Sequence, residues 1–281
     1  MTEQLARAPE ETVAFEPAKL REPGFWSRPE TYLRPGVLFV FLLLWEGIVG
    51  LFSIPAYFLP APSTVLSSLI GHLQTPTFWN NAGITLREIV IGYLIAVAIG
   101  LGVGALVSQS PLTERVILPY LVAFQTIPKV ALAPILLVWF GFGIESKIVM
   151  VTLVAFFPIL INVVEGLRSV ESEKIEMLRS LGASRFQVFR KIRVPNAAPF
   201  IFAGLDLGII FAVLGAVVAE FVGAQGGLGY QLLQYNYNFD VASMFAMLVV
   251  LSALGLTGHT IVRLFQRKFA FWAVGSSMPG A

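Results

Sequence analysis

The sequence predicts an all-α, polytopic integral membrane protein with six transmembrane helices, both termini in the cytoplasm, and a helical loop between spans four and five. Of its 281 residues, 56% are hydrophobic and only 13% are charged, and the mean hydropathy is +0.78. Soluble domains carry about 25% charged residues. The polar surface is therefore too small to cover a water-facing exterior, and lipid must be the solvent for much of the chain.

The first 35 residues are polar and contain five prolines, which argue against a long helix. No short apolar core with a small-residue cleavage site precedes residue 36, so a cleaved signal peptide is not expected. The predicted organisation is a cytoplasmic N-terminal tail at 1–35, a six-span domain at 36–268 and a C-terminal tail at 269–281.

Six stretches are apolar and close to the roughly 20 residues that a helix needs to cross the hydrocarbon core. Proline and polar clusters separate them. The expected spans are 36–52, 84–108, 116–140, 147–167, 197–222 and 243–262.

Basic residues predict the orientation of these spans, because short cytoplasmic loops accumulate Lys and Arg. With the N-terminus inside, all of the 19 Lys and Arg residues except Arg87, Lys129 and Lys147 lie on the cytoplasmic side. The segments 53–83 and 223–242 contain none. The opposite orientation would export most of the positive charge and is rejected. Arg87 and its neighbour Glu88 either pair locally or face the protein interior.

Spans two and five carry small residues at intervals of four, which let membrane helices approach closely. Packing within the chain and packing between subunits both explain the pattern, and the first explanation is the simpler one. The small residues are Gly92, Ala96, Gly100, Gly104 and Ser108 in span two, and Gly204, Gly208, Ala212 and Ala216 in span five.

The loop at 169–195 predicts two short helices. Glu171 and Glu173 lie near the start of the first, where the helix dipole favours acidic side chains. Gly182 is suited to end it in a left-handed conformation. Ser184 followed by Gln187 fits a capping box that opens the second helix. Pro195 is expected to discourage its continuation.

Apolar side chains on this loop provide a contact surface: Leu178, Leu181, Phe186, Phe189 and Ile192. A compact, hydrophobic and basic element on the cytoplasmic side suits a docking partner. Packing on its own membrane domain or on lipid headgroups explains the same residues.

The spacing of Glu176, Gly182, Ile192 and Pro195 resembles the EAA motif of permease subunits in binding-protein-dependent type I ABC importers. Met177 and Leu178 stand where that motif has alanines. Over roughly residues 35–270 the chain is similar to the nitrate, sulfonate and taurine branch of this family. The similar segments are IPKVALAPILLVWFGFGIESKI (127–148), LGASRFQVFRKIRVPNAAP (181–199) and AEFVGAQGGLGY (219–230).

The resemblance implies that the chain couples to a separate ATPase through residues 171–193. It implies an assembly of two permease copies, here a homodimer, with two ATPase subunits and a periplasmic or lipid-anchored solute-binding protein, in the bacterial inner membrane. The ATPase-coupling residues it assigns are Glu176, Met177, Leu178, Leu181, Gly182, Ala183 and Ser184.

The sequence shows no catalytic site. It contains no GxxxxGK[ST] phosphate-binding loop and no HExxH motif. Its two histidines, His72 and His259, lie far apart, and cysteine is absent, which excludes a disulfide framework and a thiolate metal site. The chain is therefore expected to be a transport subunit without cofactor, metal or nucleic-acid partner, and ATP hydrolysis is expected in another chain.

Ionisable residues within a bilayer usually face protein or water. Lys129, beside Pro128, is expected either to line the translocation path and meet an anionic solute or to pair with a carboxylate or extend to an interface. Gln125, one helical turn earlier, shares its face. Glu220 either lines the outer gate or binds a neighbouring loop, and Asp206 is placed to bond across helices.

Two other functions compete with the importer permease. A secondary transporter would use Lys129, Asp206 and Glu220 to couple ions to solute, and would not need an ATPase. A polytopic membrane enzyme is disfavoured because no catalytic constellation is visible. Lys129 and the family branch suggest that the solute is an organic or inorganic anion of the nitrate, sulfonate or taurine type, although related branches carry neutral or cationic vitamin precursors.

Overall fold

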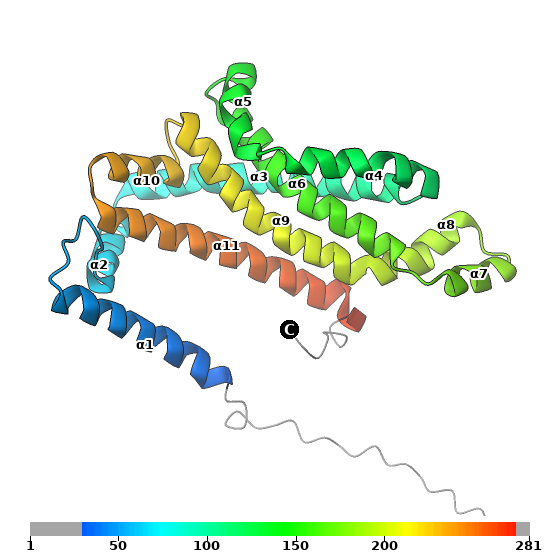
Figure 1. Ribbon diagram of the computed structural model, residues 1–281, viewed down its shortest axis with the longest axis horizontal. Coiled ribbons are helices and arrows are strands. Elements are labelled where there is room, and N and C mark those ends of the chain that lie inside the picture. Colours follow the sequence, from blue (N-terminus) through cyan, green and yellow to red (C-terminus); the bar gives the residue numbers. More distant parts are fainter. Residues whose placement is uncertain (1–29, 274–281) are drawn as a thin grey trace, which may run out of the picture. The chain divides into compact units, whose positions relative to one another are not determined.

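A computed structural model of the chain describes residues 30–273 (Figure 1). Residues 1–48 and residues 49–281 form two separate units. The helix α1 (Glu30–Leu51) begins in the first unit, covers the first expected span, and contains Pro35. Residues 1–29 and 274–281, which make up most of the two expected tails, lie outside the described residues.

The described part of the second unit is helical. Its elements, in chain order, are α2 (Pro62–Leu73), α3 (Pro76–Val107), α4 (Pro111–Thr126), η2 (Lys129–Leu132), α5 (Ala133–Phe140), α6 (Ile144–Arg168), α7 (Ser172–Ser180), α8 (Arg185–Val188), η3 (Phe189–Arg193), α9 (Val194–Gly223), α10 (Leu228–Tyr237), α11 (Val241–Phe269) and η4 (Phe271–Ala273).

Four helical stretches in the described chain are long and apolar enough to cross a membrane: Pro76–Val107, Ile144–Arg168, Arg185–Gly223 and Val241–Phe269. They coincide with the second, fourth, fifth and sixth expected spans. A shorter apolar helix, Pro35–Leu51, coincides with the first.

The third expected span, 116–140, is not one continuous helix. It consists of Arg115–Thr126 and Lys129–Phe140, which are bent by 77° relative to each other. Pro128 causes the break, because proline has no N–H to donate and its ring excludes helical geometry at the residue before it. Ile127 is accordingly extended, with φ −63° and ψ 126°.

The core of the second unit is built around α6, which packs between α3 and α9. Val151, Ile159 and Val163 of α6 are almost completely buried and face glycines on both neighbours. Gly92, Gly100 and Gly104 of α3 meet these three side chains from one side, and Gly204, Gly208 and Gly215 of α9 meet α6 from the other. The small-residue pattern is thereby confirmed as packing within the chain.

Two glycines of α3 provide a matched test of this packing. A Cβ at Gly104 would lie 2.6 Å from Cγ1 of Val163, whereas a Cβ at Gly102 would meet nothing within 4 Å. We expect Gly104→Val to lower the thermal unfolding midpoint of the detergent-solubilised protein, because overpacking costs about 1–3 kcal/mol. Gly102→Val makes the same change in the same helix and should leave the midpoint nearly unchanged. Equal shifts in both variants would contradict close α3–α6 packing.

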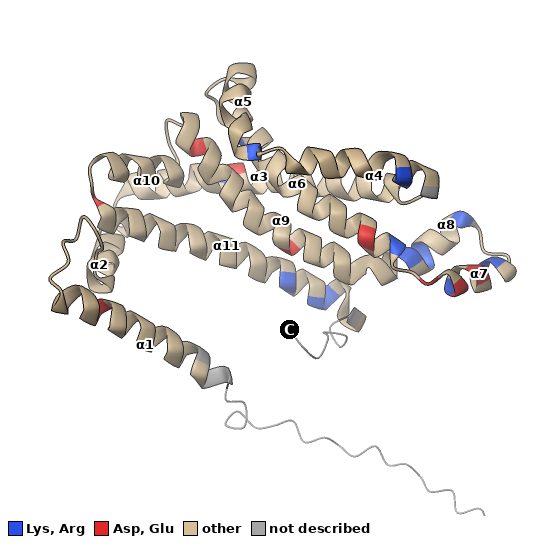
Figure 2. Ribbon diagram, viewed as in Figure 1, with Lys and Arg blue, Asp and Glu red and all other residues tan. Residues whose placement is uncertain are grey.

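Basic residues gather at one end of the second unit (Figure 2). They lie on α7, α8 and η3 and near the C-terminal end of α11, where Arg263, Arg267 and Lys268 follow one another along the helix. The helices α2 and α10 lie at the opposite end (Figure 1) and contain no Lys or Arg. The charge is therefore distributed unevenly along the direction of the spans.

Candidate coupling surface and translocation path

The loop between α6 and α9 forms a helical hairpin, α7–α8 (172–188), that ends its first helix at Gly182. Gly182 has φ +80°, a conformation that L side chains rarely adopt. Its N–H donates to the carbonyl of Arg179 at 2.9 Å, and the N–H of Ala183 donates to the carbonyl of Leu178 at 3.0 Å. This pair of bonds is a Schellman motif, which satisfies carbonyls at the end of a helix. The expected helix stop at Gly182 is confirmed.

The second helix of the hairpin opens with the expected capping box. The N–H of Gln187 donates to Oγ of Ser184 at 3.3 Å, and the N–H of Ser184 donates to Oε1 of Gln187 at 2.8 Å. Both ends of the turn 181–184 are therefore fixed by local hydrogen bonds, and the hairpin has a defined shape.

The expectation that Pro195 stops this helix is wrong. The chain remains helical from Arg185 to Gly223, through the π-helical turn η3. The N–H of Val194 donates to the carbonyl of Phe189, five residues earlier. Such a widened turn relaxes the hydrogen-bond pattern where proline follows, and proline in the first turn of α9 lacks only an N–H that the wider turn does not require.

All seven coupling residues expected from the sequence lie together on this hairpin. The turn exposes apolar side chains to a degree that is unusual outside a membrane: Met177 is 59% exposed, Leu181 is 76% exposed and Phe186 is 68% exposed. Glu176, Gly182 and Ser184 are also exposed, and Leu178 and Ala183 are half-buried. The hairpin thus presents a shaped surface with an apolar tip and a polar margin.

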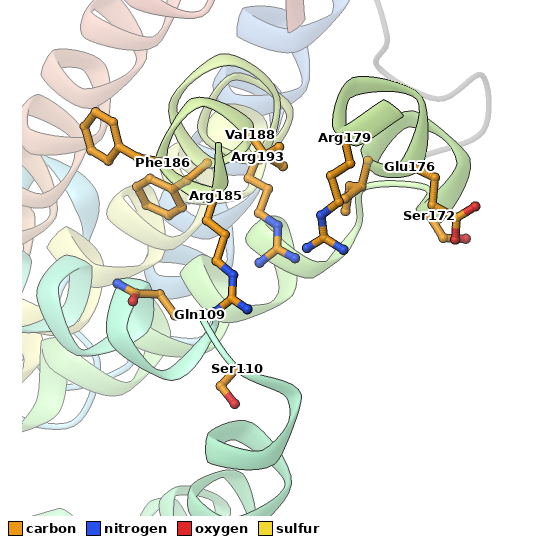
Figure 3. A pocket seen from close by; sticks show the side chains of 11 residues that line it. Gln109, Ser110, Ser172, Glu176, Arg179, Arg185, Phe186, Val188 and Arg193 are labelled. Atoms are coloured by element: carbon orange, nitrogen blue, oxygen red, sulfur yellow. The ribbon is translucent and has the colours of Figure 1, made fainter. Parts of the chain in front are cut away.

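A pocket of about 790 Å³ opens behind this tip, between the hairpin and the turn that joins α3 to α4 (Figure 3). Arg179, Arg185 and Arg193 line it, together with Glu176. Figure 3 shows the three guanidinium groups directed into the pocket and Glu176 directed away from them. Gln109 and Ser110 form the opposite wall.

The break in the third span brings Gln125 and Lys129 together. Nζ of Lys129 donates to the backbone carbonyl of Gln125 at 3.1 Å and lies 4.8 Å from the ring centre of Phe157 on α6. Gln125 is exposed and Lys129 is half-buried. Non-helical backbone at membrane depth is tolerated only where it is buried in protein or lines a water-filled cavity. The exposed break therefore meets the physical requirement for a segment that lines a path.

Glu220 lies in a different place, in a fully buried polar cluster near the other end of α9. Its Oε1 accepts from the hydroxyl of Thr85 at 2.6 Å, and its Oε2 accepts from the N–H groups of Gly229 at 2.5 Å and Tyr230 at 3.2 Å. Thr85 Oγ1 accepts in turn from the N–H of Leu228 at 2.8 Å. In this conformation Glu220 holds the segment 224–230 against α3, which matches the second of its two expected roles.

Sequence reasoning gave no role to Asn81 and Lys147 of this cluster, and for Glu88 it left open whether the side chain pairs with Arg87 or faces the interior. Asn81 accepts from the N–H of Gly227 at 2.6 Å, and Lys147 is 2% exposed and donates to the carbonyls of Phe142 and Gly223. Glu88 is 2% exposed and faces the interior, whereas Arg87 is exposed. The spacing of Asn81, Thr85 and Glu88 could have revealed the cluster, because these residues continue the buried face of α3 on which its glycines lie.

Asp206 bonds across helices as expected. Its Oδ1 lies 2.5 Å from Nδ1 of His259 on α11, and its Oδ2 lies 3.9 Å from Nε of Arg263. Among the described residues, no group of three or more His, Asp or Glu side chains is arranged to hold a metal ion.

The several apolar spans, one of them broken, define a polytopic membrane protein. Residues 89–271 match the family described as "Binding-protein-dependent transport system inner membrane component", and the chain belongs to this family. It is thus the permease subunit of an ABC transporter, a multi-pass protein of the inner membrane, and ATP hydrolysis belongs to a separate subunit. The family resemblance drawn from the sequence is confirmed.

The chain is similar along most of its length to permeases of known transport systems. It is 34% identical over 241 residues to the formylaminopyrimidine transport permease protein ThiX of Halalkalibacterium halodurans, covering 85% of this chain and 96% of ThiX. It is 30% identical over 256 residues to the taurine transport system permease protein TauC of Escherichia coli, covering 88% and 93% of the two chains.

A solved structure shares the fold. A chain of the MetNI methionine ABC transporter, in an inward-facing conformation, matches with a TM-score of 0.58 and 26% sequence identity. The match covers 67% of this chain and 95% of the MetNI chain. The matched two thirds of this chain therefore shares its fold with a chain of an ABC transporter.

Proposed function

We propose that this chain forms the translocation path of an ATP-driven importer for a small solute and couples to its ATPase through residues 171–193. The observation that carries the proposal is the α7–α8 hairpin, whose turn is fixed by a Schellman motif and a capping box while its apolar tip is exposed. Exposed apolar patches rimmed by polar residues mark interaction sites. These residues lie within the loop that joins the fourth and fifth spans, which extends over 169–195.

The proposed assembly contains two copies of this chain, two ATPase subunits and an external solute-binding protein. With α1 and the bent pair each counted as one span, the chain crosses the membrane six times within 36–268, and its tails at 1–35 and 269–281 lie in the cytoplasm. The gathering of Lys and Arg at the hairpin end supports this orientation, because cytoplasmic segments carry the excess of basic residues.

The tip of the hairpin offers a direct test of docking. We expect Leu181→Asp to reduce the amount of ATPase subunit recovered with the purified permease by about tenfold or more. A leucine that becomes buried on docking contributes roughly 1.5–3 kcal/mol to the binding free energy. Leu66→Asp on α2 makes the same change at an exposed leucine at the opposite end and should leave recovery unchanged. Undiminished recovery with Leu181→Asp would contradict docking through the tip.

We further propose that the solute is an anion of the nitrate, sulfonate or taurine type, and that Gln125 and Lys129 line its path. Lys129 supports this proposal because it places a positive charge at an exposed break in a span. Similarity to TauC agrees with a sulfonate, whereas similarity to ThiX points to a formylaminopyrimidine. For Glu220, the buried cluster supports a role in holding the outer segment rather than contact with the solute in this conformation.

Taurine uptake distinguishes these solutes. In proteoliposomes containing the complete transporter, we expect Lys129→Gln to lower ATP-driven taurine uptake about tenfold, because charge-assisted hydrogen bonds contribute about 1.5–3 kcal/mol. Lys129→Arg keeps the charge and should retain more of the uptake. A wild-type transporter that carries formylaminopyrimidine and not taurine would contradict the anion proposal.

A further inference from the structure

The arginine-lined pocket behind the hairpin has an excess of positive charge. Its lining contains three arginines and one glutamate, a formal net charge of +2. Among the side chains that the structure describes, none of these arginines is in an ion pair. Like charges that converge on one space repel each other. An anion in the pocket would offset this repulsion.

Arg193 adds a second, independent observation. Its Nη1 donates to the carbonyl of Ser108 at 3.0 Å, which fixes the guanidinium at the wall of the pocket. Its Nε is buried and has no hydrogen-bond partner. Because this Nε is closed to solvent, a ligand in the pocket would meet the other nitrogens of the guanidinium group, which Figure 3 shows directed into the pocket. A planar guanidinium fixed in this way is well suited to phosphate.

The position of the pocket along the membrane normal indicates where that phosphate would come from. The helix α9 (Val194–Gly223) has 30 residues and is about 45 Å long, the thickness of a bilayer with its headgroups. Arg193 directly precedes α9 and therefore lies at the level of the headgroups at the hairpin end. Gln109 and Ser110, which form the opposite wall of the pocket, follow the end of α3. Arg185 begins the same continuous helix, Arg185–Gly223, and lies farther from the membrane centre than Arg193.

The rest of the lining suits an amphipathic ligand. Ile175, Phe186, Val188 and Phe189 contribute apolar surface beside the three arginines. A soluble anion gains nothing from that surface, whereas the glycerol and upper acyl carbons of a lipid bury against it. Basic pockets between membrane helices on the cytoplasmic side are a known arrangement for acidic lipid headgroups.

We propose that this pocket binds the phosphate of an anionic phospholipid from the cytoplasmic leaflet, with Arg179, Arg185 and Arg193 as its ligands. The proposal rests on the orientation given under the proposed function, in which the hairpin is cytoplasmic. A bound lipid would brace the hairpin against the α3–α4 turn, so that the position of the coupling surface depends on the membrane composition.

Two pairs of basic residues in the same loop provide the test. Arg179→Gln/Arg185→Gln removes two charges from the pocket, and Arg190→Gln/Lys191→Gln removes two charges that do not line it. The full permease–ATPase complex is purified with each pair, and phosphatidylglycerol binding is measured by native mass spectrometry. The shift of the thermal midpoint is measured with phosphatidylglycerol, phosphatidylcholine and inorganic phosphate.

We expect phosphatidylglycerol alone to bind and to raise the midpoint. Binding should weaken roughly thirtyfold in the pocket pair, about fivefold for each basic residue lost, and should be unchanged in the control pair. Equal loss in both pairs, or stabilisation by inorganic phosphate that matches phosphatidylglycerol, would overturn the proposal. A pocket pair that loses the ATPase but keeps the lipid would show that the arginines bind an acidic segment of the partner instead. Lipid binding is read as added mass on the permease chain in the native mass spectrum, whether or not the ATPase stays bound, so its failure is distinct from failure of ATPase coupling.

Discussion

Replacing Gly182 by valine is expected to uncouple ATP hydrolysis from transport while the protein still inserts and assembles. Gly182 has φ +80°, and a β-branched residue there is strained by roughly 1–2 kcal/mol even though a Cβ would meet nothing within 4 Å. The strain therefore acts on the turn and not on its surroundings, so it changes the angle between α7 and α8. About tenfold lower solute uptake per ATP hydrolysed is the expected result, since each 1.4 kcal/mol corresponds to a factor of about ten.

The matched control at this position is Gly182→Asn. Asparagine adopts the left-handed conformation more readily than other non-glycine residues, so this variant should keep most of the coupling. Uptake and ATPase activity are measured together in proteoliposomes of the complete transporter. Normal coupling in Gly182→Val, or equal loss in both variants, would count against a turn whose geometry transmits motion.

Replacing Glu220 by alanine is expected to destabilise the protein more than Gly104→Val does. Three donors lose their acceptor: the hydroxyl of Thr85 and the N–H groups of Gly229 and Tyr230. The buried ammonium of Lys147 also loses one of the acidic groups near it. Removing one member of a buried charged group costs on the order of 3–5 kcal/mol. The thermal midpoint in detergent should fall, and proteolysis should begin in the segment 224–230.

Two variants bracket this effect. Glu220→Gln keeps an oxygen that accepts from Thr85, but its NH2 group faces the N–H groups of Gly229 and Tyr230, which have no acceptor there. The thermal midpoint of this variant should therefore lie between those of Glu220→Ala and the parent protein. Glu165→Ala removes an exposed carboxyl from α6 and should change stability by less than about 0.5 kcal/mol. A Glu220→Ala midpoint as high as that of Glu165→Ala would show that the cluster does not hold the outer segment.

The hairpin could be predicted from the sequence because its structure is determined locally. The Schellman motif at Gly182 and the capping box at Ser184 each join residues at most five positions apart. The spans at α3, α6, α9 and α11 could be predicted for a similar reason, since apolar length alone defines them. The glycines of α3 face α6 because close packing of membrane helices requires small residues.

The buried polar cluster could not be predicted in the same way. Its members come from the start of α3, the start of α6, the end of α9 and the segment after it, and only the folded chain brings them together. Hydropathy marks such residues as the edge of a span, and for that reason the second span was expected to begin at 84 although α3 begins at Pro76. Pro128 lies within the third expected span, and a proline can kink a helix, but its presence does not determine that the two halves turn by 77°.

Site-specific cross-linking tests most directly whether the hairpin docks on the ATPase. The chain contains no cysteine, so one introduced thiol is unique. Ser180 at the end of α7 and Ser67 on α2 are both exposed serines whose hydroxyls donate to a carbonyl three residues earlier, at 2.8 and 2.9 Å. Each is replaced by cysteine, coupled to a photoreactive maleimide in native membranes, and the adducts are identified by mass spectrometry. The docking account predicts an adduct with a P-loop ATPase from Ser180→Cys and none from Ser67→Cys. Absence of an ATPase adduct from Ser180→Cys, or equal ATPase adducts from both positions, would contradict it.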